Sequence, residues 1–300
     1  MKILSKIRPE GVIVPLLTPF NKNEKIDKKS LINLIDYLLN SKVDGLFILG
    51  SSGEFNLLSE KERSDFIRLV VDEVNGRLPV YAAISDPGTE NAIRYAQTAK
   101  DVGADAIVAT TPYYYKTSQE GIIDHYKNII YRSEMPLMIY HIPTWTYQDI
   151  SLETANKLAD EDLIVALKYT TSNMNSFQNY VRLLGDRISM LIGQDPLFYT
   201  ALELGADGGV LGSANVAPSQ YVEIYKKYKE GRKDASKKIQ KSVFPLTDIM
   251  GLGYYPAALK EAMKLIGRPV GPVRKPLVRV SNPQIQQIAK ALKQMNMLKK

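Results

Sequence analysis

The chain has 300 residues, of which 45% are hydrophobic and 24% charged, as expected of a globular protein with a sizeable core. It contains no cysteine, which excludes disulfides, thiolate catalysis and thiolate metal sites. No apolar run reaches the roughly 18 residues that a transmembrane helix needs, so we expect no membrane partner.

The net charge of +7 at pH 7 raises the question of a nucleic-acid partner. The excess of Lys and Arg is concentrated in residues 226–241 and at residues 299–300, which we interpret as solvated helix faces. Aromatic residues do not alternate with these cations in a stacking pattern, so we expect no nucleic-acid partner. Residues 1–12 lack the apolar core and cleavage site of a signal peptide, which favours a cytoplasmic protein.

In chain order, short apolar runs typical of β-strands alternate with longer amphipathic segments typical of helices. Residues 27–42 follow the first run, with Leu31, Ile35 and Leu38 on one helical stripe and Asp27 as a candidate N-cap. The predicted strands lie at residues 11–20, 45–50, 79–85, 105–112, 136–143, 163–170, 188–193 and 208–213.

This alternation indicates a parallel sheet whose almost wholly apolar strands are covered on both faces. Eight such units between about residues 11 and 231 predict an α/β fold, a closed (β/α)8 TIM barrel. The alternative is an open doubly wound sheet, which usually carries a glycine-rich nucleotide loop after its first strand. Residues 18–27 occupy that place and contain no glycine.

After residue 231 the strand pattern stops. Residues 235–250, 254–267 and 282–298 predict about three further helices, joined by the proline-rich residues 267–283. We therefore expect a catalytic barrel domain over residues 1–231 and a C-terminal helical extension over residues 232–300 that packs on the barrel.

The active site of such a barrel lies at the C-terminal ends of its strands, where the sequence places hydroxyls, one lysine and one acid. Lys168 interrupts an apolar strand, where desolvation should lower its pKa and leave a neutral amine. That amine can attack a carbonyl carbon and form a Schiff base, which accepts electrons when the adjacent C–C bond breaks or forms. The alternative is a lysine that extends its ammonium to the barrel rim.

Tyr140 ends the strand before that of Lys168 and is the candidate proton-transfer partner. Ser51 or Ser52, together with Tyr114, are candidates to complete a hydroxyl relay. Ordinary aromatic packing at a strand edge is the alternative for this tyrosine cluster, and strand alternation would turn Tyr114 away from its two neighbours.

Gly50 and Gly53 permit a tight turn whose N–H groups, with the two serine hydroxyls, would hold a carboxylate. A plain turn between strand and helix is the alternative. The two histidines, His125 and His141, show no metal-site spacing, so we expect no metal.

These residues occur in an order that resembles the dihydrodipicolinate synthase/N-acetylneuraminate lyase superfamily of Schiff-base barrel enzymes. The resemblance covers essentially the whole chain, through VPLLTPF, GSSGE, TPYYY, YHIP, the sixth-strand lysine and GADGGVLGSANV. It implies that Lys168 forms a Schiff base with pyruvate or a related 2-oxo acid and that Tyr140 is the general acid/base. It also implies that Ser51 and Ser52 bind the pyruvyl carboxylate.

The same resemblance implies that Tyr114 joins the proton relay, commonly across a subunit interface, and that the Val210 carbonyl lies near the keto acid. Members are usually homotetramers built from two tight dimers. The covalent imine between lysine and substrate takes the place of a separate cofactor, so none is expected.

For the aldehyde partner, some residues resemble the synthases and others resemble the sugar-acid aldolases. Trp145 stands where the synthases carry an arginine that grips a carboxylate, and a tryptophan offers one N–H donor and no charge. Residues 193–209, beginning with Gly193 and Asp195, look like archaeal-type 2-keto-3-deoxygluconate aldolases and neuraminate lyases, in which the acid bonds sugar hydroxyls. Glu54, by contrast, is common in synthases and lyases.

We therefore expect a lyase of carbohydrate metabolism that reversibly cleaves a 2-keto-3-deoxy sugar acid to pyruvate and an aldehyde. The alternatives are the synthase reaction, which condenses pyruvate with aspartate semialdehyde, and a dehydratase acting on keto-deoxy sugar acids. A non-catalytic barrel that binds keto acids is a further alternative, but it would be expected to lack Lys168 or Tyr140.

Overall fold

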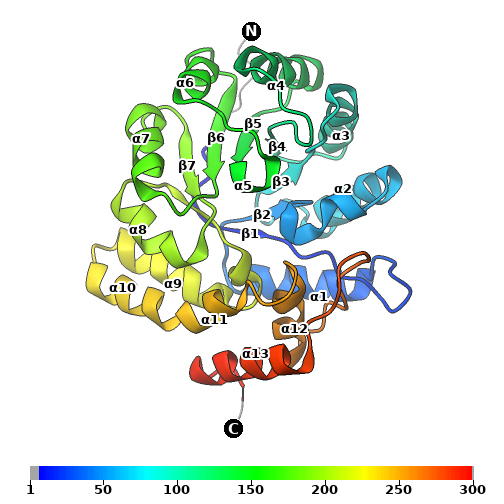
Figure 1. Ribbon diagram of the computed structural model, residues 1–300, viewed down its shortest axis with the longest axis vertical. Coiled ribbons are helices and arrows are strands. Elements are labelled where there is room, and N and C mark those ends of the chain that lie inside the picture. Colours follow the sequence, from blue (N-terminus) through cyan, green and yellow to red (C-terminus); the bar gives the residue numbers. More distant parts are fainter. Residues whose placement is uncertain (1–6, 299–300) are drawn as a thin grey trace.

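The computed structural model describes residues 7–298 and confirms the closed parallel barrel. Each strand pairs with the next, and the last returns to pair with the first (Figure 1). The strands are β1 (Gly11–Pro15), β2 (Gly45–Ile48), β3 (Val80–Ala83), β4 (Ala106–Thr110), β5 (Leu137–His141), β6 (Ile164–Tyr169), β7 (Ser189–Ile192) and β8 (Gly208–Val210).

Helices follow the strands and surround the barrel, as Figure 1 shows. Asp27 caps the first of them by accepting a hydrogen bond from the Ser30 N–H, and Ser59 forms a capping box with Glu62. The helices of this part are α1 (Lys28–Asn40), α2 (Glu60–Val74), α3 (Thr89–Asp101), α4 (Gln119–Ser133), α5 (Pro143–Thr146), α6 (Leu152–Asp160), α7 (Met174–Leu184), α8 (Phe198–Glu203) and α9 (Pro218–Lys229).

Every strand residue is buried, because the inner face fills the barrel and the outer face packs under the helices. Burying one large aliphatic or aromatic side chain contributes about 1.5–3 kcal/mol, so this layered core is the main source of stability. Within residues 7–298, no helix has both the length and the apolar character required to cross a membrane.

The C-terminal extension differs from expectation in one respect. The single helix predicted over residues 235–250 is two helices, because Pro245 lacks an N–H and its ring disrupts a continuous helix. The helices here are α10 (Lys233–Ser242), α11 (Phe244–Ile249), α12 (Ala257–Leu265) and α13 (Asn282–Gln294).

A buried ion pair joins this extension to the barrel. The Lys260 Nζ on α12 lies 2.6 Å from the Glu54 Oε1, and both side chains are almost completely buried. The same Nζ donates to the carbonyls of Thr18 at 2.8 Å and Pro272 at 2.9 Å. The second Glu54 oxygen accepts the Arg274 N–H at 2.8 Å. Both charged groups are therefore paired and hydrogen-bonded.

The network fixes three separate segments relative to α12: the loops after β1 and β2 and the residues before α13. Burial lowers the pKa of Lys260 to about 8, against the opposing effect of the Glu54 charge. Because the partners hold the ammonium at several points, this lysine serves to hold the segments together.

Replacing Lys260 with Met should lower the free energy of unfolding by about 3–5 kcal/mol, because the Glu54 carboxylate would stay buried without its cation. Denaturant titration measures this loss. Lys264→Met is the matched control, since Lys264 lies one turn further along α12 with an exposed side chain and should change stability by no more than about 0.5 kcal/mol. Equal losses in the two variants would contradict a stabilising role for the buried pair.

Candidate active site

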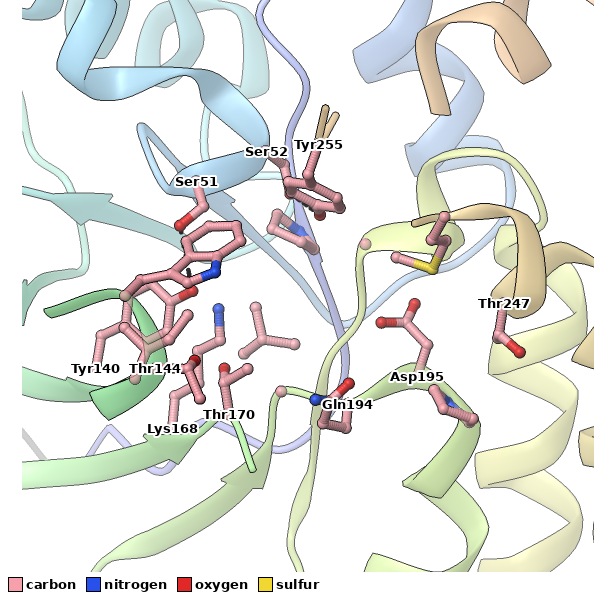
Figure 2. A pocket seen from close by; sticks show the side chains of 18 of the residues that line it. Ser51, Ser52, Tyr140, Thr144, Lys168, Thr170, Gln194, Asp195, Thr247 and Tyr255 are labelled. Carbon is pink, nitrogen blue, oxygen red and sulfur yellow. Dashed lines mark hydrogen bonds between the residues drawn. The ribbon is translucent and has the colours of Figure 1, made fainter. Parts of the chain in front are cut away.

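A cavity of about 390 Å³ opens at the C-terminal ends of the strands. Figure 2 shows Lys168, Tyr140 and Ser51 on one side of it and Asp195 and Thr247 on the other. The lining residues are Pro15, Ser51, Ser52, Tyr140, Ile142, Thr144, Trp145, Lys168, Thr170, Gly193, Gln194, Asp195, Pro196, Val210, Gly212, Thr247, Met250, Gly251 and Tyr255.

Lys168 is buried beside aromatic rings from β5 and β2 rather than extended to the rim. It is 4% exposed and lies in register with Tyr140 on β5. Its Nζ is 3.7 Å from the centre of the Tyr140 ring and 4.7 Å from that of Phe47. Burial lowers the pKa of Lys168 to about 7, while the charge of Asp195 acts in the opposite direction. A large share of this amine is therefore neutral and nucleophilic near neutral pH.

Gly193 makes room for this lysine at the end of β7. A Cβ at this position would lie 3.1 Å from the Lys168 Cε and 2.1 Å from the Thr170 Oγ1. The second distance is far below any real contact, so a larger residue would displace Thr170 and crowd the lysine.

Tyr140 places its hydroxyl 3.3 Å from the Ser51 Oγ, and its ring meets Phe47 edge-on. Burial raises the pKa of Tyr140, while the hydroxyls of Ser51 and Thr170 act in the opposite direction. The phenol is therefore protonated at neutral pH and linked to a second hydroxyl through which a proton can pass.

Ser51 and Ser52 lie in η1 (Ser51–Gly53), a short 3-10 turn directly after β2. Both line the cavity, whereas Gly50 and Gly53 shape the turn beneath them. The Gly53 N–H donates to the Gly50 carbonyl at 2.9 Å, so it is engaged within the turn. The two serine hydroxyls face the cavity, and that of Ser52 lies 2.6 Å from the Tyr255 hydroxyl.

Asp195 begins η3 (Asp195–Leu197) on the opposite wall, near Val210 of β8. One carboxylate oxygen accepts hydrogen bonds from the Ser213 N–H, at 2.7 Å, and from the Ser213 hydroxyl, which also contacts the Tyr221 hydroxyl. Burial raises the pKa of Asp195, and the bonds from Ser213 lower it in part. The Ser213 bonds hold the carboxyl group in one orientation at the cavity wall.

Trp145 on α5 forms the rim of the cavity. Its ring is 52% exposed and meets the Tyr255 ring edge-on at 5.8 Å between centres. The side chain thus contacts the C-terminal extension at the edge of the cavity that holds Lys168.

Tyr114 lies outside this cavity, and its surroundings differ from those predicted. It is 86% exposed and has a φ of +79°, and β4 ends at Thr110, so the expected strand alternation does not apply to it. Tyr115 packs edge-on against it, while Tyr113 packs against Phe55. The three tyrosines therefore belong to a loop rather than to a strand edge.

The sequence pattern missed the lining residues from the C-terminal extension: Thr247, Met250, Gly251 and Tyr255. The two histidines lie outside the cavity. His141 is buried with its Nε2 3.0 Å from the Asp149 carboxylate, and the Nδ1 of His125 lies 2.9 Å from the Thr89 hydroxyl. Within residues 7–298, no three His, Asp or Glu side chains gather as a metal site would require.

The model of the dihydrodipicolinate synthetase family matches residues 8–295. The chain belongs to this family. It is 34% identical over 281 residues to the 4-hydroxy-tetrahydrodipicolinate synthase of Oceanobacillus iheyensis, covering 94% of this chain and 95% of that relative. It is 37% identical over 276 residues to the enzyme of the same name from Psychrobacter sp., covering 91% and 90%.

Solved structures of the family have the same fold. Dihydrodipicolinate synthase from Aquifex aeolicus gives a TM-score of 0.93 at 32% identity and covers 97% of this chain and 100% of its own. YagE from E. coli K12, solved in complex with pyruvate, gives 0.93 at 30% identity and covers 96% and 99%. The family consists of carbon–carbon lyases and synthases of the class I aldolase type, and the present chain is an enzyme of this type.

The lowered pKa of Lys168 predicts selective labelling of its amine. With formaldehyde and a hydride reductant, methylation of Lys168 should reach half of its maximal rate near pH 7 and fall about tenfold for each pH unit below that. Mass spectrometry of peptides measures the rate, with the exposed Lys275 in the same sample for comparison. Identical pH profiles for the two lysines would contradict the lowered pKa.

Proposed function

We propose that this enzyme is a pyruvate-dependent aldolase that reversibly cleaves a 2-keto-3-deoxy sugar acid to pyruvate and an aldehyde. The buried amine of Lys168, with a pKa of about 7, beside the Tyr140 phenol carries the imine chemistry. Trp145 in the cavity lining carries the choice of an uncharged aldehyde. Two relatives support pyruvate as the keto acid, since YagE and the Acinetobacter baumannii synthase were each solved with pyruvate.

In the first step, the neutral Lys168 amine attacks the C2 carbonyl of the sugar acid. The carbinolamine hydroxyl takes the Tyr140 proton and leaves as water, which gives a protonated imine and a Tyr140 phenolate. The C4 hydroxyl of the substrate then gives its proton to the Tyr140 phenolate, which the Ser51 hydroxyl 3.3 Å away stabilises.

The C3–C4 bond then breaks, and its electron pair moves into the imine to give an enamine while the aldehyde leaves. Tyr140 then gives its proton to C3 and restores the protonated imine. Water hydrolyses this imine, Tyr140 takes back the proton that is released, and pyruvate and the free amine result. In this proposal, the Ser51 and Ser52 hydroxyls bind the carboxylate of the keto acid, and the Val210 carbonyl lies beside it.

The walls of the cavity favour an uncharged, hydroxylated aldehyde. Beyond the lysine, the substrate would meet the hydroxyls of Thr144 and Thr247, the carboxyl group of Asp195 and the rings of Trp145 and Tyr255. Hydroxyl and carboxyl groups pair well with sugar hydroxyls, whereas the Trp145 ring offers a single N–H donor to a carboxylate.

The second candidate is the condensation of pyruvate with aspartate semialdehyde. It is favoured by the names of the relatives, since the Oceanobacillus and Psychrobacter proteins are both called 4-hydroxy-tetrahydrodipicolinate synthase. The two candidates share the imine on Lys168 and differ in the aldehyde.

Direct assays separate these candidates. The enzyme should release pyruvate from 2-keto-3-deoxygluconate faster than it condenses pyruvate with aspartate semialdehyde. The reason is that the Trp145 ring offers one N–H donor and no positive charge to the carboxylate of the semialdehyde. Borohydride with pyruvate should leave an adduct on Lys168, and Lys168→Ala should abolish both turnover and adduct while circular dichroism shows an intact fold. Lys275 is exposed and lies outside the cavity, so Lys275→Ala is the control variant and should retain activity.

Faster condensation with aspartate semialdehyde would overturn the sugar-acid substrate and leave the imine chemistry in place. A folded wild-type protein that gives no adduct with pyruvate would overturn both candidates.

We also propose a homotetramer of two tight dimers in which Tyr114 of one copy reaches the relay of another. A second cavity of about 330 Å³ supports this, because it adjoins Ser51 and is lined by Phe55, Leu57 and Tyr113 among others, a surrounding that suits an aromatic ring. The exposed Tyr114 is such a ring. Sedimentation should show an assembly that Tyr114→Ser weakens together with turnover, and a fully active monomer would contradict the proposal.

A further inference from the structure

We infer that Tyr255, from the C-terminal extension, orients the Ser52 hydroxyl so that Ser52 donates its proton to the carboxylate of the bound keto acid. The inference rests on the proposed function, in which Ser52 binds that carboxylate. Tyr255 would thus be a positioning residue that acts through Ser52.

The phenol of Tyr255 is held in place from several sides. Its hydroxyl lies 2.6 Å from the Ser52 Oγ, a close hydrogen bond between two side chains that are far apart in the sequence. A Cβ on Gly212 would lie 2.5 Å from the same hydroxyl, so the phenol packs directly on the glycine backbone. The ring meets Trp145 edge-on. Little freedom is left for the hydroxyl to turn away from Ser52.

The direction of the hydrogen bond follows from the chemistry of its two partners. Each hydroxyl carries one proton. Only one of the two protons lies between the oxygens, so one hydroxyl donates the hydrogen bond and the other accepts it. Burial raises the pKa of Tyr255, and the charge of Asp195 adds to this, so the phenol keeps its proton. When the phenol donates to the Ser52 Oγ, the Ser52 proton is free to point into the cavity.

A carboxylate selects this arrangement, because an ionised carboxylate only accepts hydrogen bonds. The chain then runs from the Tyr255 phenol through the Ser52 hydroxyl to the substrate, and each bond polarises the next. Without the phenol, the Ser52 hydroxyl would lose both its fixed orientation and this polarisation.

A second contact joins the same two segments. The helix α12 starts directly after Pro256, and its Lys260 pairs with Glu54, two residues beyond Ser52. The turn after β2 and the chain that enters α12 are thus tied both by the Ser52–Tyr255 pair and by the buried ion pair. This double attachment fixes the phenol relative to the serine.

Tyr255→Phe tests the inference, because it removes the hydroxyl and keeps the ring against Trp145. The concentration of pyruvate that gives half-maximal borohydride trapping on Lys168 should rise about tenfold or more, as expected for losing a hydrogen bond that supports a charged group. Acetone carries a methyl group in place of the carboxylate, so it loses no hydrogen bond to Ser52, and its trapping should stay within about twofold of wild type.

Two further variants complete the design. Tyr254→Phe makes the same chemical change at the exposed neighbouring tyrosine and should leave pyruvate trapping unchanged. In a Ser52→Ala background, Tyr255→Phe should add no further loss, because its effect passes through Ser52.

Equal losses for pyruvate and acetone in Tyr255→Phe would show a purely structural role and overturn the inference. Unchanged pyruvate trapping, or a full additional loss in the Ser52→Ala background, would also overturn it. A wild-type protein without any pyruvate adduct would instead defeat the proposed function itself, so the two failures are distinguishable.

Discussion

The constraint on which this structure depends is the exclusion of water from a closed parallel barrel that contains a lysine. Within residues 7–298 two lysines are buried, Lys168 in the barrel and Lys260 on α12, and their surroundings differ. Lys260 has a carboxylate and two backbone carbonyls around its ammonium. Lys168 has the faces of two aromatic rings and no ion pair with any residue of 7–298, and its pKa falls further, to about 7. The same desolvation thus yields a structural cation in one place and a nucleophile in the other.

The two halves of the cavity come from different parts of the chain. Lys168, Tyr140 and Ser51 come from the barrel strands and the turn directly after one of them, where parallel pairing sets their positions. The rest of the lining comes from α5, η3 and the C-terminal extension, which the barrel register does not determine. Changes in this second group can alter the aldehyde that fits while leaving the amine and its proton partner in place.

Much of the fold follows from the sequence because periodicity is a local property. Buried parallel strands appear as short apolar runs, and the N-caps at Asp27 and Ser59 are local patterns as well. Lys168 stands out for the same reason, since it is a charged residue within an apolar run. Tyr255 shows no such signal, because its partner Ser52 is distant in the sequence and no local hydrophobic pattern marks Tyr255 as a residue of the site. Tyr114 was placed on a strand because the pattern does not reveal its positive φ.

The pairing of Glu54 with Lys260 also bears on the order in which the protein is made. The ribosome has completed all eight strands when Val210 emerges, and Lys168 has then already been incorporated. The counter-ion of Glu54 follows only with α12, and Tyr255 shortly before it. Lys168 is therefore present in the nascent chain before the partners of Ser52 and Glu54 are made, and the finished site depends on segments that follow the barrel in the chain.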